Sequence, residues 1–441
     1  MDSTTGPAPA QASTPQLRDS PQRWWLAALL VSSMMVLYAH RGALSIAAPY
    51  MIKELNLSTA VMGALLSAFF WSYWLMQVPA GWLVDRFGAR RAYALGFAFW
   101  SISSAFTGLV GGLAALMFVR MLVGVGQAVA FPASARAVAN WFRDKERGTV
   151  TGAYLSGVRL GQALIAAIGV FLLAKYGWKG FFIAIGLPPL IWILPWMLFL
   201  KKWEVRENGA APGTPRGAAA AAPKPASFLQ SLALLRERTV LGIFLGFFAY
   251  DYAWFVFLTW LPGYLKLERG FSDREMAIYS AVPFVAMSLV IVGSGVLSDF
   301  LIRRGLRETL VRKWLIAVGL AVACLIVPAG LVEDKMTAVW LLSISLCGLG
   351  ISSPNTWTLT QAVCSRRIVG TVSGIQNFGG NLGGVLAPSV TGLIAHQTQS
   401  FSLALTLTGV ILVGGILSYW LLIGQRVEPP SSGPEPAPVG G

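Results

Sequence analysis

Long apolar stretches alternate with short polar segments along the whole chain. A helix that crosses a bilayer needs about 20 predominantly apolar residues, and each of the twelve stretches is long enough. The pattern therefore predicts an all-α integral membrane protein with twelve transmembrane helices. The predicted helices cover about residues 24–50, 58–83, 92–112, 114–140, 149–174, 180–200, 239–266, 276–301, 312–332, 336–363, 368–396 and 401–424.

A tract rich in alanine, glycine and proline separates the sixth and seventh stretches. Residues 207–227 read ENGAAPGTPRGAAAAAPKPAS and have no pattern of a packed core, which is typical of a flexible linker. We therefore expect two six-helix halves joined by a cytoplasmic linker and flanked by disordered cytoplasmic tails. The expected parts are a tail at 1–22, an N-terminal half at 23–202, a linker at 203–237, a C-terminal half at 238–425 and a tail at 426–441.

Basic residues cluster in alternate connections between the apolar stretches. Examples are DRFGARR at 85–91, RDKER at 143–147 and RRGLRETLVRK at 303–313, whereas HQTQS at 396–400 carries no lysine or arginine. Cytoplasmic loops of membrane proteins are enriched in these two residues. Both termini are therefore predicted to be cytoplasmic, and the net charge of +15 reflects topology rather than nucleic-acid binding.

The composition fits a membrane protein, and the sequence has few features of an enzyme. Hydrophobic residues make up 55% of the chain and charged residues only 12%, whereas soluble domains carry about 25% charged residues. Cys324, Cys347 and Cys364 lie in or beside apolar stretches without metal-like spacing, so we interpret them as packing residues. The sequence shows no metal-ligand cluster, phosphate-binding loop or nucleophile constellation, and we expect neither a cofactor nor a metal.

Ionisable side chains inside the apolar stretches are the candidates for function. Such residues are costly in a bilayer and usually face a bundle interior or an aqueous cavity. At 1.5 Å per residue, Arg41 lies about 25 Å along the first stretch, and Arg120 falls at a similar depth. The same estimate puts Arg159, Asp251 and Gln127 near the membrane midplane.

These residues also have structural interpretations. Arg41 could snorkel to the interface, and Arg120 and Arg159 could serve only a structural network. Three arginines against one aspartate nevertheless leave a positive interior, and a guanidinium fork suits a carboxylate. The expected partner is thus an organic anion.

An internal repeat divides the chain in the same way as the linker. GWLVDRFGARR begins at Gly81 after the second stretch, and GVLSDFLIRRG begins at Gly295 after the eighth, 214 residues later. Two parallel six-helix halves are typical of secondary transporters. The first copy resembles the cytoplasmic loop motif G-x-x-x-D-R-x-G-R-R of the major facilitator superfamily, and the resemblance implies that superfamily's fold.

That resemblance implies a conformational switch at the repeated loops. Such a switch would hold the two halves together on the cytoplasmic side and break when that side opens. The alternative is that the arginines only set the topology. The expected switch residues are Gly81, Asp85, Arg86, Gly88, Arg90, Gly295 and Asp299.

Further segments resemble the anion:cation symporter family, which includes bacterial galactonate, glucarate and hexuronate carriers. They are SAFFWSYWLMQVPAGWLVDRFGARR, FPASARAVANWF, ERGTVTG, FLTWLPGYL and NFGGNLGGVLAP. By this resemblance Arg41 binds the substrate carboxylate and Tyr73 lies beside it. The same resemblance gives Thr356, Trp357 and Asn377 as contacts to sugar hydroxyls and Arg120 as a modulator of the coupling site.

The chain departs from this family where protons are usually coupled. The acid that precedes the first-helix arginine is His40 here, the fourth-helix glutamate is Gln127, and a fifth-helix glutamine is Val158. His40 has a reference pKa near neutrality, although it could equally be a packing or helix-capping residue. Asp251 or His40 would then carry the coupled proton, and Arg120, Arg159 and Gln127 would form a charge network. The alternative for Asp251 is a permanently ionised partner of an arginine in the opposite half.

We therefore expect a monomeric secondary active transporter of the bacterial inner membrane. It would import a small organic anion by proton-coupled alternating access, with a sugar acid favoured and an aromatic or short-chain carboxylate as the alternative substrate. Its partners would be the anion, protons and the lipid bilayer, with no nucleic acid. The acids missing at positions 40 and 127 leave open a non-coupled facilitator or an anion exchanger, and a transporter-like receptor is a third hypothesis.

Overall fold

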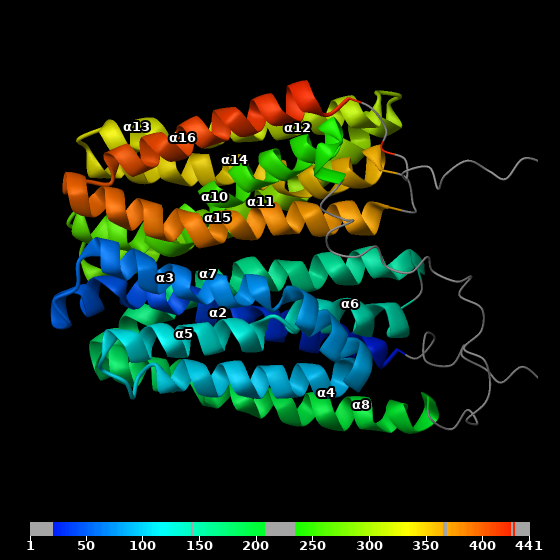
Figure 1. The fold of residues 1–441 in the computed structure, drawn as a ribbon, viewed down its shortest axis with the longest axis horizontal. Helices are drawn as coiled ribbons and strands as arrows, with labels where there is room; N and C mark the ends of the chain where they lie inside the picture. The colour runs from blue at the N-terminus through cyan, green and yellow to red at the C-terminus, as the bar shows by residue number, and fades with distance from the viewer. Residues whose placement is uncertain (1–20, 143, 208–233, 365–367, 425–426, 428–441) are drawn as a thin grey trace, which may run out of the picture.

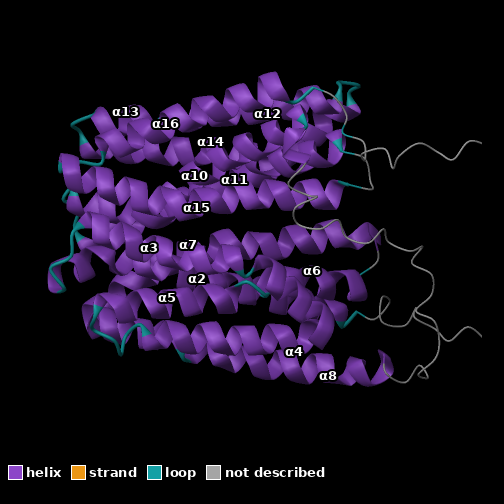
Figure 2. Cartoon of the chain, in the orientation of Figure 1, coloured by secondary structure: helices purple, strands orange, loops and turns teal. Residues whose placement is uncertain are grey.

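The computed structural model describes residues 21–142, 144–207, 234–364, 368–424 and 427, and its regular elements there are helices (Figure 1, Figure 2). Most of the expected tails and of the expected linker lies outside the described residues. The helices are α2 (Arg23–Glu54), α3 (Thr59–Leu75), α4 (Gln77–Phe106), α5 (Leu113–Gln127), α6 (Ala130–Trp141), α7 (Asp144–Gly186), η1 (Pro188–Trp192), α8 (Ile193–Glu207), η2 (Leu234–Arg236), α10 (Arg238–Leu267), α11 (Asp273–Arg303), α12 (Glu308–Ala323), α13 (Ile326–Leu331), α14 (Lys335–Val363), α15 (Val369–Thr398), α16 (Ser402–Leu417) and η3 (Ser418–Leu422).

The helices form two bundles that lie side by side (Figure 1). Helices α2 to α8 make up the N-terminal bundle, and α10 to η3 make up the C-terminal bundle. Across the boundary α3 packs on α15, α7 on α11 and α2 on α10. We call the end where α8 stops and α10 starts the linker end, and the end where α2 and α15 stop the far end.

Two glycines turn the chain within segments that are otherwise helical. Gly88 in α4 has φ 78° and Gly177 in α7 has φ 63°. Residues with a Cβ atom rarely adopt such values, so glycine is the residue that makes these turns possible. Both α4 and α7 are therefore two helices joined at a sharp kink.

Nine helical segments among the described residues are long and apolar enough to cross a membrane, and Thr59–Leu75 is a shorter apolar helix. Large hydrophobic side chains on their outer faces are exposed, as at Ile191 and Leu289, which are each 72% exposed. Such an apolar outer surface is stable in lipid and not in water. The structure therefore confirms an all-helical, multi-pass membrane protein.

Hydrogen bonds between described residues of the two bundles lie in the middle and toward the far end. Ser45 donates to the main-chain oxygen of Thr259 at 2.6 Å, and Ser67 donates to that of Val385 at 2.8 Å. Ser67 also shares a 2.8 Å hydrogen bond with Ser389. Small side chains let α3 and α15 approach closely here.

Side-chain caps define the starts of several helices at the far end. Ser58 accepts from the N–H of Val61 at 3.2 Å, and Asp334 accepts from that of Thr337 at 2.6 Å. This hydrogen bond holds the pKa of Asp334 below its usual value because the ionised form is the better acceptor. The caps satisfy N–H groups that the helices leave free.

A bulky residue at position 63 should separate the bundles at the far end. A Cβ atom at Gly63 would lie 2.5 Å from the main-chain oxygen of Pro388, which belongs to α15. Overpacking of this kind costs about 1–3 kcal/mol, so Gly63→Val should shift the population toward separated far ends by about fivefold or more. Double electron–electron resonance between labels at positions 54 and 397, in a cysteine-free background, would measure the shift.

Gly152→Val is the matched control for this change, because a Cβ atom at Gly152 would meet nothing within 4 Å. The control should keep the wild-type distance distribution. An unchanged distribution in Gly63→Val would contradict a tight contact between α3 and α15.

Candidate functional site

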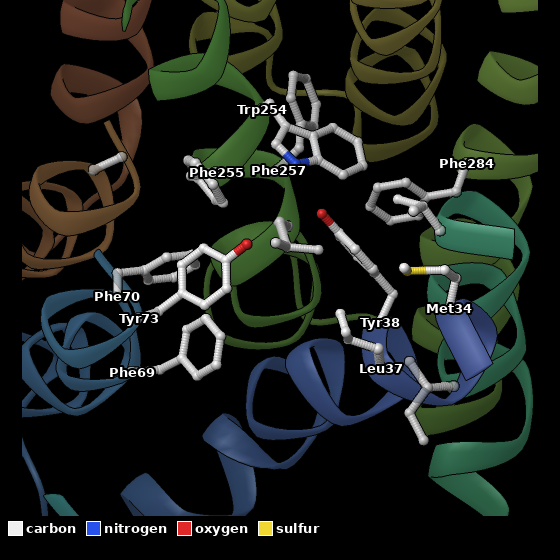
Figure 3. Close-up of a cluster of buried hydrophobic side chains, with 14 of the residues drawn as sticks. Met34, Leu37, Tyr38, Phe69, Phe70, Tyr73, Trp254, Phe255, Phe257 and Phe284 are labelled. Atoms are coloured by element: carbon white, nitrogen blue, oxygen red, sulfur yellow. The ribbon is translucent and has the colours of Figure 1, made fainter. Parts of the chain in front are cut away.

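Arg41 of α2 lies in a cage of three aromatic rings. Its guanidinium carbon is 4.7 Å from the ring centre of Tyr38, 4.9 Å from that of Phe69 and 4.4 Å from that of Tyr73. Figure 3 shows these rings together, with the two tyrosine hydroxyl groups turned toward the space between them and toward α10. Aromatic faces attract a cation electrostatically, and more strongly when water is excluded.

The donors of Arg41 are only partly used. Its Nε donates to Oε1 of Gln127 at 2.9 Å, and one terminal nitrogen donates to the Tyr38 hydroxyl at 3.3 Å. Gln127 in turn donates to the main-chain oxygen of Leu37 at 3.3 Å, which fixes the orientation of its amide. The second terminal nitrogen, Nη2, is buried and has no partner within the described residues. Arg41 therefore offers a free charged donor, although the residue is only 6% exposed.

Arg120 of α5 brings a second positive charge to the same aromatic group. Its guanidinium carbon lies 5.7 Å from the ring centre of Phe69, and the residue is 2% exposed. Nε and one terminal nitrogen of Arg120 are buried without a partner in the described part of the chain. Arg41 and Arg120 are close enough to repel each other electrostatically. An anion between them would relieve that repulsion.

His40 faces a different neighbour from Arg41. Its Nε2 lies 2.8 Å from the main-chain oxygen of Ile185 in α7, so Nε2 carries the hydrogen and donates to that oxygen. Its Nδ1 is buried and has no partner among the described residues. The side chain is thus held inside the N-terminal bundle, within the electrostatic reach of Arg120.

Arg159 of α7 reaches across the boundary between the bundles. Its guanidinium carbon lies 3.7 Å from the ring centre of Trp254 in α10, and one terminal nitrogen is buried without a described partner. Arg159 also interacts electrostatically with Tyr250 and Asp251 on the same helix. Residues of both bundles therefore meet at this position.

Asp251 is partly buried and lies against Gly380 of α15. A Cβ atom at Gly380 would collide with a carboxylate oxygen of Asp251. No ion pair within 4.0 Å joins Asp251 to another described residue. The Asp251 carboxylate can therefore accept a proton, or it can pair with a positively charged group that moves toward it.

The three other residues expected to contact substrate lie in the C-terminal bundle. Thr356 is fully buried, and its hydroxyl donates to the main-chain oxygen of Ser353 at 2.9 Å. Trp357 is 36% exposed and packs edge-on against Phe247 with the ring centres 5.1 Å apart. Asn377 is partly buried. Among the four residues expected to contact substrate together with Arg41, Tyr73 is the one that the structure places directly against it.

The repeated loop motif lies at the linker end. Arg86 is exposed and stacks over Trp82, 5.1 Å from the ring centre, while the main-chain oxygen of Arg90 accepts from the Trp196 indole at 2.9 Å. The side chain of Asp85 lies outside the described residues. A Cβ atom at Gly81 or Gly295 would meet nothing within 4 Å, so neither glycine forms a close helix contact here. Asp299 is exposed, and its main-chain oxygen accepts from Arg303 at 3.3 Å.

Sequence reasoning missed two aromatic contributors to the site. Tyr38 lies one helical turn before Arg41, and side chains three residues apart on a helix are neighbours, so the spacing alone could have identified it. Phe69 supplies a face to Arg41 and to Arg120. No short-range signal links Phe69 to either arginine. Within the described residues no group of three or more histidine, cysteine, aspartate or glutamate side chains could hold a metal ion.

Comparisons with known proteins agree on one family. Residues 29–388 match the family model described as Major Facilitator Superfamily. The chain is 31% identical over 429 residues to the D-galactonate transporter of Escherichia coli, covering 95% of this chain and 98% of that one. It is 33% identical over 417 residues to the Escherichia coli protein named "Probable galactarate/D-glucarate transporter" (89% and 93% covered). It is 32% identical over 405 residues to the hexuronate transporter of Bacillus subtilis (91% and 95%).

Solved structures show the same fold at low sequence identity. A bacterial homologue of the human lysosomal transporter Spinster, in an inward-facing and unoccupied conformation, matches with a TM-score of 0.77 and 21% identity, covering 93% of this chain and all of that one. A D-xylose–proton symporter matches with a TM-score of 0.70 and 18% identity, covering 91% and 99%.

Removing the acceptor of Arg41 should destabilise the protein. Gln127→Leu leaves Nε of Arg41 buried without a partner, and a hydrogen bond to a charged group contributes about 1.5–3 kcal/mol. The midpoint of thermal unfolding in detergent should therefore fall. Gln127→Glu keeps the acceptor and adds a negative charge, so it should be at least as stable as the wild type. A Gln127→Leu variant that unfolds at the wild-type temperature would show that this hydrogen bond contributes little.

Proposed function

The chain belongs to the Major Facilitator Superfamily, and we propose that it imports a sugar acid by alternating access. It is a multi-pass transporter of the cell membrane and not an enzyme. The observation that carries the proposal is the free, buried donor of Arg41 inside its aromatic cage. A planar guanidinium suits a carboxylate, and the aromatic faces suit the C–H faces of a sugar chain. The relatives named for galactonate, galactarate and hexuronate transport support a sugar acid as the substrate.

We infer twelve membrane passes with both termini in the cytoplasm. The apolar segment Val150–Leu200 has 51 residues and turns at Gly177, so it is long enough for two passes. The kink at Gly88 likewise divides α4, and the part of α4 after it continues as a separate helix. The basic loops at the linker end favour a cytoplasmic location for that end.

In this arrangement the far end is the periplasmic side. The interbundle hydrogen bonds of Ser45 and Ser67 would then close the periplasmic entrance, while the substrate exchanges with the cytoplasm. Movement of one bundle against the other would expose Arg41 to each side in turn. The switch residues at Asp85 and Asp299 would hold the cytoplasmic side closed in the other conformation.

Within the site we assign roles by position. Arg41 would bind the carboxylate with Tyr73 beside it, and Trp357 and Asn377 would contact hydroxyl groups. Thr356 would act from its buried position by orienting this part of α14.

The coupled proton would be carried by Asp251, with His40 as the second candidate. Asp251 carries no close ion pair among described residues and interacts electrostatically with Arg159 of the opposite bundle. Its protonation can therefore respond to movement of the bundles and to the arrival of an anion. A facilitator or anion exchanger is the second candidate function, because Gln127 gives Arg41 an amide partner where the family has an acid.

Arg41→Lys should weaken substrate binding strongly although it keeps the charge. An ammonium group forms no bidentate pair with a carboxylate and fits the three aromatic faces less well. We expect a tenfold or larger increase in the dissociation constant of a transported sugar acid, measured by isothermal titration calorimetry. Wild-type affinity in Arg41→Lys would exclude Arg41 as the carboxylate site.

Asp251→Asn should abolish uptake driven by a pH gradient in proteoliposomes. It should preserve counterflow between preloaded vesicles, because exchange requires substrate binding but no net movement of protons. Accumulation against a substrate gradient by Asp251→Asn, under a pH gradient alone, would exclude Asp251 and direct the same experiment to His40→Gln. A wild-type protein that exchanges but never accumulates substrate would instead support the exchanger.

A further inference from the structure

The interior between the bundles carries more positive than negative charge. Arg41, Arg120 and Arg159 lie around this space, and Asp251 is the acidic side chain that the described residues place with them. Three cations and one anion leave a formal charge of +2, with Arg41 and Arg120 buried and Arg159 and Asp251 partly buried. Isolated buried charges are costly unless they are paired.

Each arginine also keeps a buried nitrogen without a partner among the described residues. These atoms are Nη2 of Arg41, Nε and Nη1 of Arg120, and Nη1 of Arg159. A guanidinium group has no acceptor capacity, so the missing partner of each nitrogen is an acceptor. The unpaired donors and the excess positive charge are separate observations, and both indicate an anionic ligand.

The unpaired donors occupy two positions rather than one. Arg41 and Arg120 lie over the same ring, that of Phe69, on the N-terminal side. Arg159 lies against Trp254 of the C-terminal bundle. The first position suits an anionic group that both guanidinium groups attract, and the second suits another anionic group.

Tyr38 connects the two positions. Its hydroxyl accepts from Arg41 at 3.3 Å, and it also lies within the electrostatic reach of Arg159 and Asp251. Figure 3 shows the Tyr38 hydroxyl turned toward Trp254, the residue on which Arg159 stacks. A chain that passes the two tyrosine hydroxyls would therefore extend from the first position to the second.

We propose that the preferred substrate is a dianion, a hydroxylated carbon chain with an anionic group at each end. One end would pair with Arg41 and Arg120, and the other with Arg159. This inference rests on the proposed function, import of a sugar acid. While Asp251 is ionised, a dianion neutralises the formal charge of +2, whereas a monoanion leaves one positive charge unpaired. Binding would also satisfy buried donors at both positions.

Three compounds with the same hydroxyl stereochemistry isolate the effect of charge. Galactitol, D-galactonate and galactarate carry no, one and two carboxylates, and the carboxylates are ionised at pH 7. Calorimetric titration of the purified full-length protein should show galactarate binding about tenfold to a hundredfold more tightly than galactonate, and galactitol more weakly than either. These factors follow from the contribution of a charge-assisted hydrogen bond. Galactonate binding as tightly as galactarate would overturn the proposal.

Variants of Arg159 identify the second position. Arg159→Gln should lower the ratio of galactarate affinity to galactonate affinity from at least ten toward one. The matched variant Arg159→Lys keeps the charge and should give an intermediate ratio. A ratio that stays at the wild-type value in Arg159→Gln would show that Arg159 does not bind the substrate. Arg159 would then interact with Asp251 or have only a packing role. The three-compound series on the wild-type protein needs no variant, so a variant that fails to fold leaves the proposal testable.

Uptake in proteoliposomes tests the import of sugar acids separately from the preference for a dianion. If galactonate and galactarate are transported at equal affinity, import of sugar acids stands and the preference for a dianion is wrong. If neither compound binds or is transported, the proposed function fails for this class of sugar acids, and the dianion preference fails with it.

Discussion

The burial of the Arg41 guanidinium within the membrane is the constraint on which the site depends. A charged residue at the bilayer centre costs at least about 2.5–3.5 kcal/mol. Three aromatic faces and two hydrogen bonds offset this cost, at about 0.5–2 kcal/mol per aromatic face and about 1.5–3 kcal/mol per charged hydrogen bond. Within the part of the chain that the structure describes, the positive charge is thus stabilised without a carboxylate. An acidic partner would have occupied the same donors and competed with a substrate anion.

The positions of Tyr38, Phe69 and Gln127 follow from that requirement. Tyr38 reaches Arg41 from the same helix, Phe69 and Tyr73 from α3, and Gln127 from α5. Three helices of one bundle must therefore keep their relative positions for the cage to persist. The C-terminal bundle contributes Trp254 and Asp251 from across the boundary, where relative movement can alter the electrostatic environment without breaking the cage.

The helical membrane fold and the candidate residue Arg41 could be predicted from the sequence, but the contacts between distant residues could not. An arginine inside an apolar stretch identifies Arg41 as a candidate, and the apolar periodicity predicts an all-helical membrane protein. The acceptor of Arg41 is 86 residues away, and Ser67 meets Val385 across 318 residues. Such contacts depend on the packing of whole helices. For α4 the charged residues Asp85, Arg86 and Arg90 interrupt the apolar pattern, and the chain turns within this segment, at Gly88.

The contact between the bundles at the far end has an energetic consequence. Serines, glycines and main-chain oxygens make much of it, and the rings of Phe70 and Phe255 meet nearby. Each hydrogen bond contributes only about 0.5–1.5 kcal/mol, because water can replace either partner when the surfaces separate. Such a contact excludes solutes because the two surfaces fit closely, although it contributes little binding energy between the bundles. In the proposed alternating-access cycle, thermal fluctuation or the binding energy of one small molecule would then be sufficient to break and remake it.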